Sequence, residues 1–308
     1  MSDDQTALVA VDWGTTSLRA ARLDPQGKVL EERFLPRGIL TIPVNGFATF
    51  FKAHFTYGTW AKCDFALVSG MAGSKQGWKE APYCPCPAGF NEVAAALTWI
   101  EPDRIAIVPG LSCEHAHAPD VMRGEEVQIF GAMQLTGLRD GVFVLPGTHS
   151  KWATVHDGRI TTFKTCMTGE FYALLSQHSI LAKSLLADAQ APFDADAFGQ
   201  GVALSCSGAG LLHTAFSART LSLFSRMDAS ALPSYLSGLV IGEELRIQLI
   251  NTNETGAGTG DEVVLIGSEG LTARYSQALA HQGVRSRMLR SEATWAGLHA
   301  LAGVIKPH

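Results

Sequence analysis

The sequence has little of what would place a protein in a membrane, on nucleic acid or outside the cell. Its 308 residues contain no apolar run of about eighteen or more, which argues against a membrane-spanning helix. The formal net charge is −5, so no basic excess favours DNA, RNA or anionic lipid. The first residues, MSDDQTALVA, are acidic where a secretory signal peptide is basic. These absences predict a cytoplasmic protein with no membrane or nucleic-acid partner.

Two familiar nucleotide motifs and any cysteine framework are absent as well. Neither GxxxxGK[ST] nor a GxGxxG between a strand and a helix occurs, which excludes the P-loop and the Rossmann device. The six cysteines form no CxxC pair and are expected to be reduced thiols. The cluster CEHAH at 113–117 fits no zinc spacing, so we expect no metal there.

What is present is a well-packed globular composition with alternating strand and helix patterns. Hydrophobic residues make up 46% and charged residues 17% of the chain, and the class expected is α/β. The length allows two domains, and the pattern of elements starts again near residue 111. We therefore expect an N-terminal lobe at 1–110 and a C-terminal lobe at 111–308.

Periodicity and turn residues predict the elements of each block. The first block predicts strands at 7–13, 17–23 and 29–35 as an antiparallel meander, a helix at 47–62, a strand at 64–70, a loop at 73–89, a helix at 91–100 and a strand at 104–111. The second predicts a helix at 124–138, three strands within 141–163, helices at 170–186 and 232–250, a loop at 251–261, a strand, glycine turn and helix within 262–283, and a terminal helix at 291–305.

The turn DWGTTS at 12–17 places one carboxylate, one glycine and three hydroxyl residues between two β-rich runs. Small residues let phosphate oxygens approach backbone N–H groups and hydroxyls, so Gly14, Thr15 and Thr16 are candidate phosphate contacts. Mg²⁺ is held by few carboxylates and keeps much of its water, which makes Asp12 the candidate metal ligand. An aspartate that only caps the turn is the alternative.

Two later stretches have related chemistry. LPGTHSKW at 145–152 repeats the strand, glycine and hydroxyl turn, with phosphate candidates Gly147, Thr148, His149 and Lys151. Lys151 could neutralise phosphate or be a solvated surface charge. VVLIGSEGL at 263–271 runs a buried strand into a glycine turn, where a flat ring or ribose can lie on the backbone; its candidates are Gly267, Ser268 and Gly270.

These motifs together resemble a known superfamily. AVDWGTTSLRAARLD is similar to the first phosphate motif of the actin-like ATPases, and Asp12 to Arg19 match the D-x-G-T-T/S-S-x-R of FGGY carbohydrate kinases, which adds Ser17 and Arg19 to the phosphate candidates. GEEVQIFGAM stands where those kinases have Gly-Asp-Gln, with Glu125 at the position of the aspartate. SEATWAGLHALAG is similar to a helix near their C-terminus.

The resemblance is closer to the 2-dehydro-3-deoxygalactonokinase family. It rests on VDWGTTSLRA, GMAGSKQGW, MRGEEVQIFG, LPGTHSKWATV and MTGEFYALLSQHSIL. The resemblance implies a two-lobed actin-like (ribonuclease H-like) fold, with mixed sheets flanked by helices and a cleft between the lobes. It also implies transfer of the γ-phosphoryl of ATP, with Mg²⁺, to the primary hydroxyl of 2-dehydro-3-deoxy-D-galactonate in galactonate catabolism.

Roles follow from this chemistry. Glu125 is the candidate general base; Glu126 competes with it, and a glutamate that merely favours the helix N-terminus is the alternative. Arg123 or Arg37 could bind the substrate carboxylate. Two segments are candidates for the sugar-acid pocket or for ordinary strand–helix connections: SGMAG with Gly70 and Met71, and MTGE with Thr168 and Glu170.

Two rival functions remain on the same scaffold. One is a kinase of another small sugar or sugar acid, and the other is a nucleotide-binding regulator without transfer activity. A pure binder needs the phosphate turns but no base, so Glu125 separates the two. The sequence leaves open the stereochemistry of the sugar acid and whether the chain forms a homo-oligomer.

Overall fold

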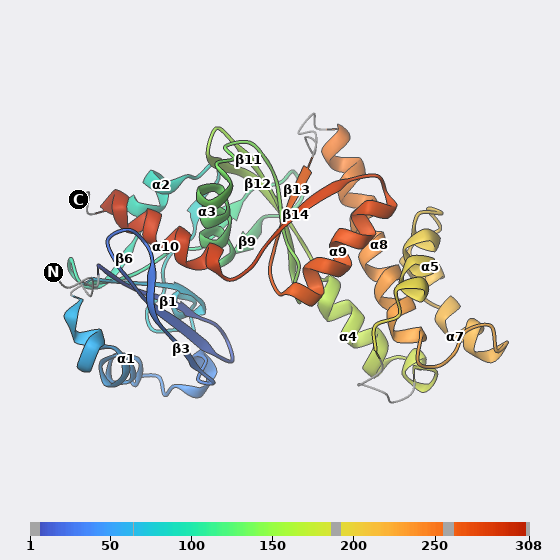
Figure 1. Ribbon diagram of the computed structural model, residues 1–308, viewed down its shortest axis with the longest axis horizontal. Coiled ribbons are helices and arrows are strands. Elements are labelled where there is room, and N and C mark those ends of the chain that lie inside the picture. The colour runs from blue at the N-terminus through green and yellow to red at the C-terminus, as the bar shows by residue number, and fades with distance from the viewer. Residues whose placement is uncertain (1–6, 64, 186–191, 255–261, 306–308) are drawn as a thin grey trace. The chain divides into compact units, whose positions relative to one another are not determined.

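The computed structural model describes residues 7–305 except 64, 186–191 and 255–261. It consists of mixed β-sheets and helices, so the expected α/β class is confirmed (Figure 1). Among the described helices, none is long and apolar enough to cross a membrane. All six cysteines are free thiols.

The first sheet is built around the N-terminal meander. Its six strands lie in the order β3-β2-β1-β4-β7-β6. Their bounds are Leu8–Trp13 (β1), Leu18–Leu23 (β2), Val29–Leu35 (β3), Ala66–Gly70 (β4), Thr98–Glu101 (β6) and Ile105–Ile107 (β7). Strands β1 to β3 pair antiparallel, as predicted, while β4 runs parallel to β1 and β7 parallel to β4. The end of β1 that carries Asp12 is therefore beside the end of β4, in the register Asp12↔Ser69.

Shorter elements connect these strands. They are η1 (Ile39–Thr41), α1 (Phe47–Phe55), η2 (Gly58–Lys62), η3 (Met71–Gly73), α2 (Phe90–Ala95), and a small sheet of β5 (Cys84–Pro85), β8 (Leu111–Cys113) and β9 (Asp120–Met122). The helix predicted at 47–62 ends at Phe55, before Gly58 takes φ +61°. The helix predicted at 91–100 is wrong beyond Ala95, because Thr98 and Trp99 pair with β7, as β-branched and aromatic residues favour.

The second sheet repeats the order of the first. Its strands lie in the order β12-β11-β10-β13-β14. Their bounds are Gly141–Leu145 (β10), Ser150–His156 (β11), Arg159–Cys166 (β12), Glu262–Ile266 (β13) and Arg285–Leu289 (β14). In both sheets the third, second, first and fourth strands of the block are neighbours, and the fourth runs parallel to the first. The repeated strand–turn–strand pattern of the sequence is thus confirmed as a repeated topology.

Helices α3 (Glu125–Thr136) and α10 (Glu292–Ile305) pack closely together (Figure 1). Two glycines make this approach feasible. A Cβ on Gly131 would lie 1.7 Å from the carbonyl oxygen of Ala293, and one on Gly297 would lie 2.0 Å from that of Val127. The backbone contact fixes α3, whose first residues are the two candidate bases.

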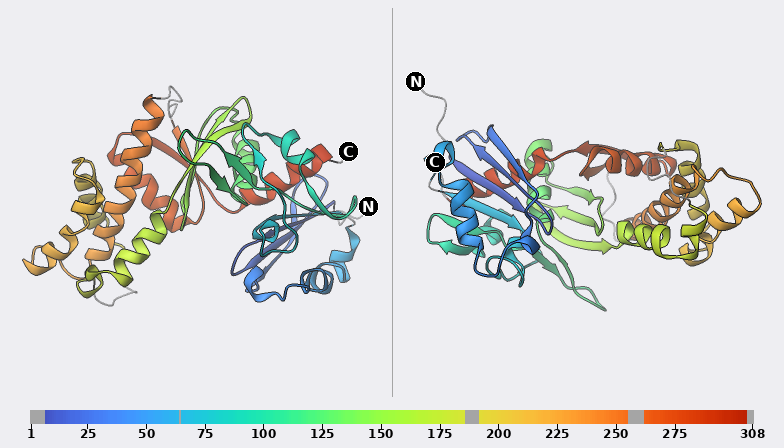
Figure 2. Two further views of the ribbon diagram at one scale, coloured as in Figure 1. Left: turned by 180° about the vertical axis from the view of Figure 1, so that it is seen from behind. Right: turned by 90° about the horizontal axis from the view of Figure 1, so that it is seen from below.

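The remaining helices form a second group, and Figure 2 shows α5 lying along α8. They are α4 (Thr168–His178), η4 (Ile180–Lys183), α5 (Ala195–Ser205), α6 (Leu211–Thr214), α7 (Ser217–Leu223), α8 (Leu232–Glu254) and α9 (Glu269–His281). The helix predicted at 170–186 stops at His178 and resumes as η4, whereas that predicted at 232–250 continues to Glu254. The rest of the loop predicted at 251–261 lies outside the described residues.

The chain divides into two compact units. Unit 1 holds the described residues up to Asp140, Ala153–Phe163 and those from Leu289 on, and unit 2 holds Gly141–Trp152 and Lys164–Met288. This division differs from the boundary expected after residue 110. The difference arises because α10 packs on α3, α2, β1 and β2, which draws the C-terminus and α3 into unit 1.

Candidate active site

In unit 1, the turn after β1 presents its hydroxyl residues outward. The backbone N–H of Gly14 donates to the carbonyl of Ser17 at 2.9 Å, which closes the hairpin. Thr15 and Thr16 are exposed at its tip. The N–H of Ile39 donates to the carbonyl of Gly14 at 3.0 Å, so the following loop supports the turn from behind. The two threonine side chains are therefore exposed to a ligand such as phosphate.

Asp12 lies at the end of β1 with one oxygen already paired. Its Oδ2 accepts from Nη2 of Arg19, the residue opposite on β2, at 2.7 Å. The described residues contain no group of three or more His, Cys, Asp or Glu side chains able to hold a metal ion. A single carboxylate fits a hydrated Mg²⁺ that takes its other ligands from water and phosphate, rather than an ion caged by protein.

Two glycines bring Asp12 close to the start of α3. Gly70 has φ +84°, and a Cβ there would lie 2.9 Å from the carbonyl of Trp13 and 3.2 Å from Oδ1 of Asp12. Gly124 has φ +104°, and its Cβ would lie 3.3 Å from the Cα of Gly70. Both positions favour glycine through backbone conformation and close approach. The structure thus gathers the candidate metal carboxylate, the SGMAG loop and the candidate bases in one place.

The two glutamates that open α3 differ in their surroundings. Glu126 is fully buried, and both of its oxygens accept from the N–H of Gly124, at 3.0 and 2.8 Å. Burial, together with the charge of Glu125, raises the pKa of Glu126 to about 8. Glu125 is half-buried, and its Oε2 accepts from the N–H of Arg123 at 2.9 Å. Of the two, Glu125 is the one whose side chain is partly exposed.

The two candidate carboxylate-binding arginines lie in different settings. The guanidinium of Arg123 sits 4.4 Å from the ring centroid of Tyr83 and donates from Nη2 to the carbonyl of Ala81 at 2.8 Å. Its Nε and Nη1 are buried, with no hydrogen-bond partner among the described residues. Arg37 is exposed, and its carbonyl accepts from Nε1 of Trp13 at 3.1 Å. Met71 packs against the core of the first sheet.

In unit 2, the second hairpin turn lies against the start of α4. The N–H of Glu170 donates to the carbonyl of Thr148 at 3.1 Å, and a Cβ on Gly169 would lie 2.6 Å from the carbonyl of Gly147. Nε2 of His149 lies 2.5 Å from a carboxylate oxygen of Glu170. The MTGE segment is therefore placed beside the second phosphate turn, and a role in the sugar-acid pocket stays a prediction.

Lys151 is not the solvated surface charge that the sequence left as an alternative. Its side chain is only 6% exposed, and Nζ donates to the hydroxyl of Thr165 on β12 at 2.7 Å. Burying an ammonium group favours an anionic or polar neighbour. A role in phosphate binding stays a prediction.

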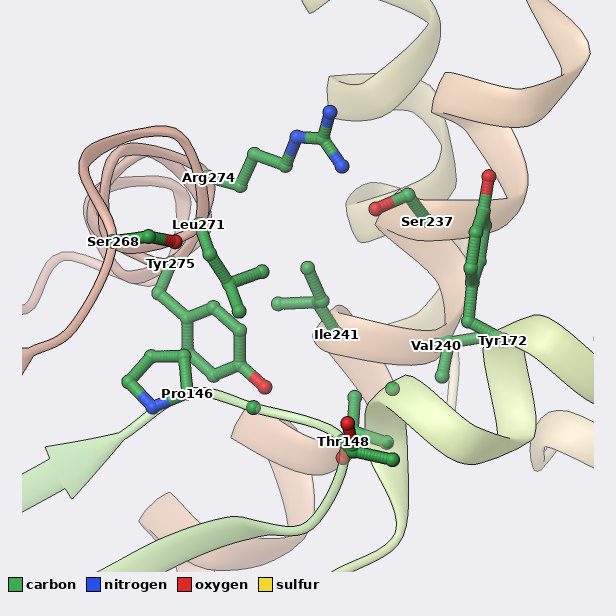
Figure 3. Close-up of a pocket in the computed structure, with 13 residues that line it drawn as sticks. Pro146, Thr148, Tyr172, Ser237, Val240, Ile241, Ser268, Leu271, Arg274 and Tyr275 are labelled. Atoms are coloured by element: carbon green, nitrogen blue, oxygen red, sulfur yellow. The ribbon is translucent and has the colours of Figure 1, made fainter. Parts of the chain in front are cut away.

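Beside the second turn is a cavity of ≈ 400 Å³ (Figure 3). Its lining is partly apolar, with a few polar groups, as is usual for cofactor sites. The lining residues are Pro146, Gly147, Thr148, Thr168, Gly169, Tyr172, Ser237, Val240, Ile241, Ser268, Leu271, Arg274 and Tyr275. Helices α4 and α9 both begin at this cavity, so two helix N-termini favour negative charge there.

The third motif contributes to this cavity through Ser268. Gly267 has φ +157° and, like Gly270, is not among the residues that line the cavity. A Cβ on Gly270 would meet no atom within 4 Å, so no protein contact requires glycine at that position. Arg274 and Tyr275, about one helical turn beyond the motif, also line the cavity. Neither was predicted from the sequence. An arginine and a tyrosine within the predicted helix were the only signal available.

The repeated strand order, together with similar solved structures, defines the class: the chain has the fold of actin-like sugar kinases. Within that class, the chain belongs to the 2-keto-3-deoxy-galactonokinase family, whose model matches residues 12–301.

Individual relatives agree over almost the whole chain. A Rhizobium meliloti (strain 1021) protein assigned as a 2-dehydro-3-deoxygalactonokinase is 39% identical over 97% of each chain. The 2-dehydro-3-deoxygalactonokinase of Escherichia coli (strain K12) is 32% identical, over 96% of this chain and 98% of its own. The crystal structure of a Sinorhizobium meliloti protein, also assigned as a 2-dehydro-3-deoxygalactonokinase, is similar as well. It has a TM-score of 0.86 at 38% sequence identity, and the match covers 98% of this chain and 100% of that chain.

Proposed function

We propose that this chain transfers the γ-phosphoryl of ATP to the primary hydroxyl of 2-dehydro-3-deoxy-D-galactonate, forming the 6-phosphate in galactonate catabolism. The observation that carries the proposal is the convergence of Asp12, Gly70 and the start of α3, in a chain of this family. That convergence supports the proposal because it brings together a candidate metal carboxylate, a glycine loop and a half-buried carboxylate, the groups that phosphoryl transfer requires.

Each unit contains candidate nucleotide-binding groups of its own. The cavity of unit 2 would take the nucleoside, with Gly147, Thr148 and the N-terminus of α4 at its phosphate end. In unit 1, Gly14, Thr15 and Thr16 are the proposed contacts for phosphate oxygens. Asp12 would hold Mg²⁺ through water, and the bound ion would neutralise charge on the phosphates.

Glu125 would accept the proton of the attacking hydroxyl. Its half-buried side chain is held by the N–H of Arg123, while Glu126 is enclosed and its pKa of about 8 keeps it largely neutral near pH 7. A neutral Glu126 adds no second negative charge beside Glu125.

The substrate carboxylate would pair with one of two arginines. The buried Nε and Nη1 of Arg123 have unused hydrogen-bonding capacity, and Arg37 is exposed beside the first phosphate turn. A bidentate guanidinium pair suits a carboxylate. We also propose a cytoplasmic location and no nucleic-acid partner.

The test is ADP formation from ATP and Mg²⁺ with a panel of acceptors. The panel holds 2-keto-3-deoxy sugar acids, common hexoses and a blank without acceptor. We expect that, of the panel, only 2-dehydro-3-deoxy-D-galactonate stimulates ADP formation. Stimulation by another compound would replace the substrate but keep the class of reaction, and nucleotide binding without any stimulation would favour a regulator.

A further inference from the structure

A buried carboxylate in unit 2 has no role in the chemistry described so far. Glu244 lies in α8 with 6% of its surface exposed. Its Oε1 accepts from the hydroxyl of Ser150 and from Nε1 of Trp152, each at 2.6 Å. Its Oε2 accepts from the hydroxyl of Tyr275 at 2.6 Å and from that of Thr168. One side chain therefore satisfies four donors.

These donors belong to the segments that build the nucleotide cavity. Thr168 begins α4 and Tyr275 lies in α9, and both line the cavity, where Figure 3 shows the Tyr275 hydroxyl directed toward the neighbourhood of Thr148. Ser150 and Trp152 lie at the start of β11, immediately after the second phosphate turn. Glu244 thus ties the turn, the first residue of α4 and the side of α9 to one point on α8.

The bonding is unusual for a buried acid, because every donor is neutral. Among the described residues no cation forms an ion pair with Glu244, and burial raises its pKa. A buried carboxylate without a cation is costly unless its lone pairs are fully used. An apolar side chain would avoid that cost but would leave the hydrogens of Ser150, Trp152 and Tyr275 without their acceptor.

We propose that Glu244 is a positioning residue for the nucleotide site, which it holds in binding-competent form by fixing the second phosphate turn, Thr168 and Tyr275. The inference rests on the proposed function, since it takes the cavity as the nucleotide site. Thr168 and Tyr275 give their hydrogens to Glu244, so they offer lone pairs to the cavity and suit ligand donors such as ribose hydroxyls. The N-termini of α4 and α9, which begin at the same cavity, favour the negative charge of the phosphates.

The test compares Glu244→Gln with Glu243→Gln. Both changes remove one charge from neighbouring positions of α8, but Glu243 pairs with Arg246 rather than with the cavity segments. The amide introduced by E244Q has one acceptor oxygen where the carboxylate has two, so two donors lose their partner. We expect the Kd of ADP, measured by calorimetry without sugar acid, to rise ~10-fold or more in E244Q and to stay within about 2-fold in E243Q.

Steady-state kinetics separates positioning from loss of folded protein. In E244Q the KM for ATP should rise with the Kd of ADP, while the KM for the sugar acid changes by less than about 2-fold. A smaller folded fraction would lower kcat and leave KM and Kd unchanged. Ser150→Ala removes one donor of the network outside the cavity lining and should raise the Kd of ADP by roughly 3-fold. If E244Q does not fold, this variant tests whether the network positions the nucleotide site.

Three results would overturn the inference. Equal ADP affinity in wild type, E244Q and S150A would show that the network does not position the site. A fall in kcat alone would assign Glu244 a purely structural role. Failure of the wild type itself to bind ADP would overturn the proposed function, and is distinguishable from the other two because it precedes any mutation.

Discussion

At the residue scale, the two adjacent carboxylates of α3 have opposite environments. Glu125 is half-buried with an oxygen on the N–H of Arg123, and Glu126 is enclosed against Gly124. Sequence reasoning identified the pair but left both as candidates, because the first turn of a helix does not reveal which side chain turns inward. The burial of Glu126 makes Glu125 the candidate for contact with substrate.

Glu125→Gln should therefore separate catalysis from binding. Loss of a general base is expected to lower kcat by at least about 10²-fold, while the Kd of ADP stays within about 2-fold of the wild type. Stopped or coupled assays of ADP formation measure kcat, and calorimetry measures the Kd of ADP. Turnover close to the wild-type rate would reject Glu125 as the base.

Glu126 should make stability depend on pH. Its pKa is about 8 in the folded chain against an ordinary value of 4.5. Between those values the folded state keeps a proton that the unfolded state has released, so the free energy of unfolding falls as pH rises through this window and levels off above about pH 8. In Glu126→Gln this contribution is missing.

The measurement is urea unfolding of wild type and E126Q at pH 5.5, 7 and 8.5. The stability of E126Q relative to wild type should improve steadily across that series. A relative stability that does not change with pH would contradict a raised pKa for Glu126.

At the element scale, the hairpins could be predicted from the sequence and several helix ends could not. Alternating apolar residues and Gly-Thr turns identify β1–β2 and β10–β11, because their partners are adjacent in sequence. The end of α2 depends on the pairing of Trp99 with β7, and that pairing with a later strand overrides the helical pattern. Glu244 was missed for a related reason, since an acid within a helix does not reveal which distant donors it meets.

The packing of α3 on α10 gives a prediction with a control in the same helix. Gly297→Ala would place a Cβ 2.0 Å from the carbonyl of Val127, so α10 must shift away. We expect a loss of about 1–3 kcal/mol in the free energy of unfolding, together with lower kcat, because α3 carries Glu125.

Gly303→Ala is the matched control on α10. A Cβ there meets no atom within 4 Å, and alanine is the better helix former, so stability should rise by up to about 1 kcal/mol with kcat unchanged. Thermal or urea unfolding measures both variants. Equal effects of the two substitutions would contradict the close glycine contact.

At the scale of the whole molecule, the division into units could not be predicted from the order of elements. The sequence suggested a break near residue 111, where the pattern of elements starts again. The contacts instead place α3 and the C-terminal α10 in unit 1, since α10 packs on β1 and β2 of the first sheet and α3 packs on α10. Such long-range packing has no local sequence signal, whereas the motifs at 12–17 and 145–152 depend on local turns and were found.

The account also assigns different tasks to the two units. Unit 1 contains the proposed metal carboxylate and the proposed base, and unit 2 contains the proposed nucleotide cavity with its Glu244 network. Variants of Glu125 and of Glu244 should therefore fail differently, the first in kcat and the second in nucleotide affinity.

The most direct test of the central claim is the position of the transferred phosphate. The protein is incubated with ATP, Mg²⁺ and 2-dehydro-3-deoxy-D-galactonate, and the product is examined by ³¹P–¹H correlation NMR. The account predicts one new phosphomonoester coupled to the protons of the primary carbon, absent without enzyme and strongly reduced with E125Q. Release of inorganic phosphate alone, or a phosphoryl group on another hydroxyl, would contradict it.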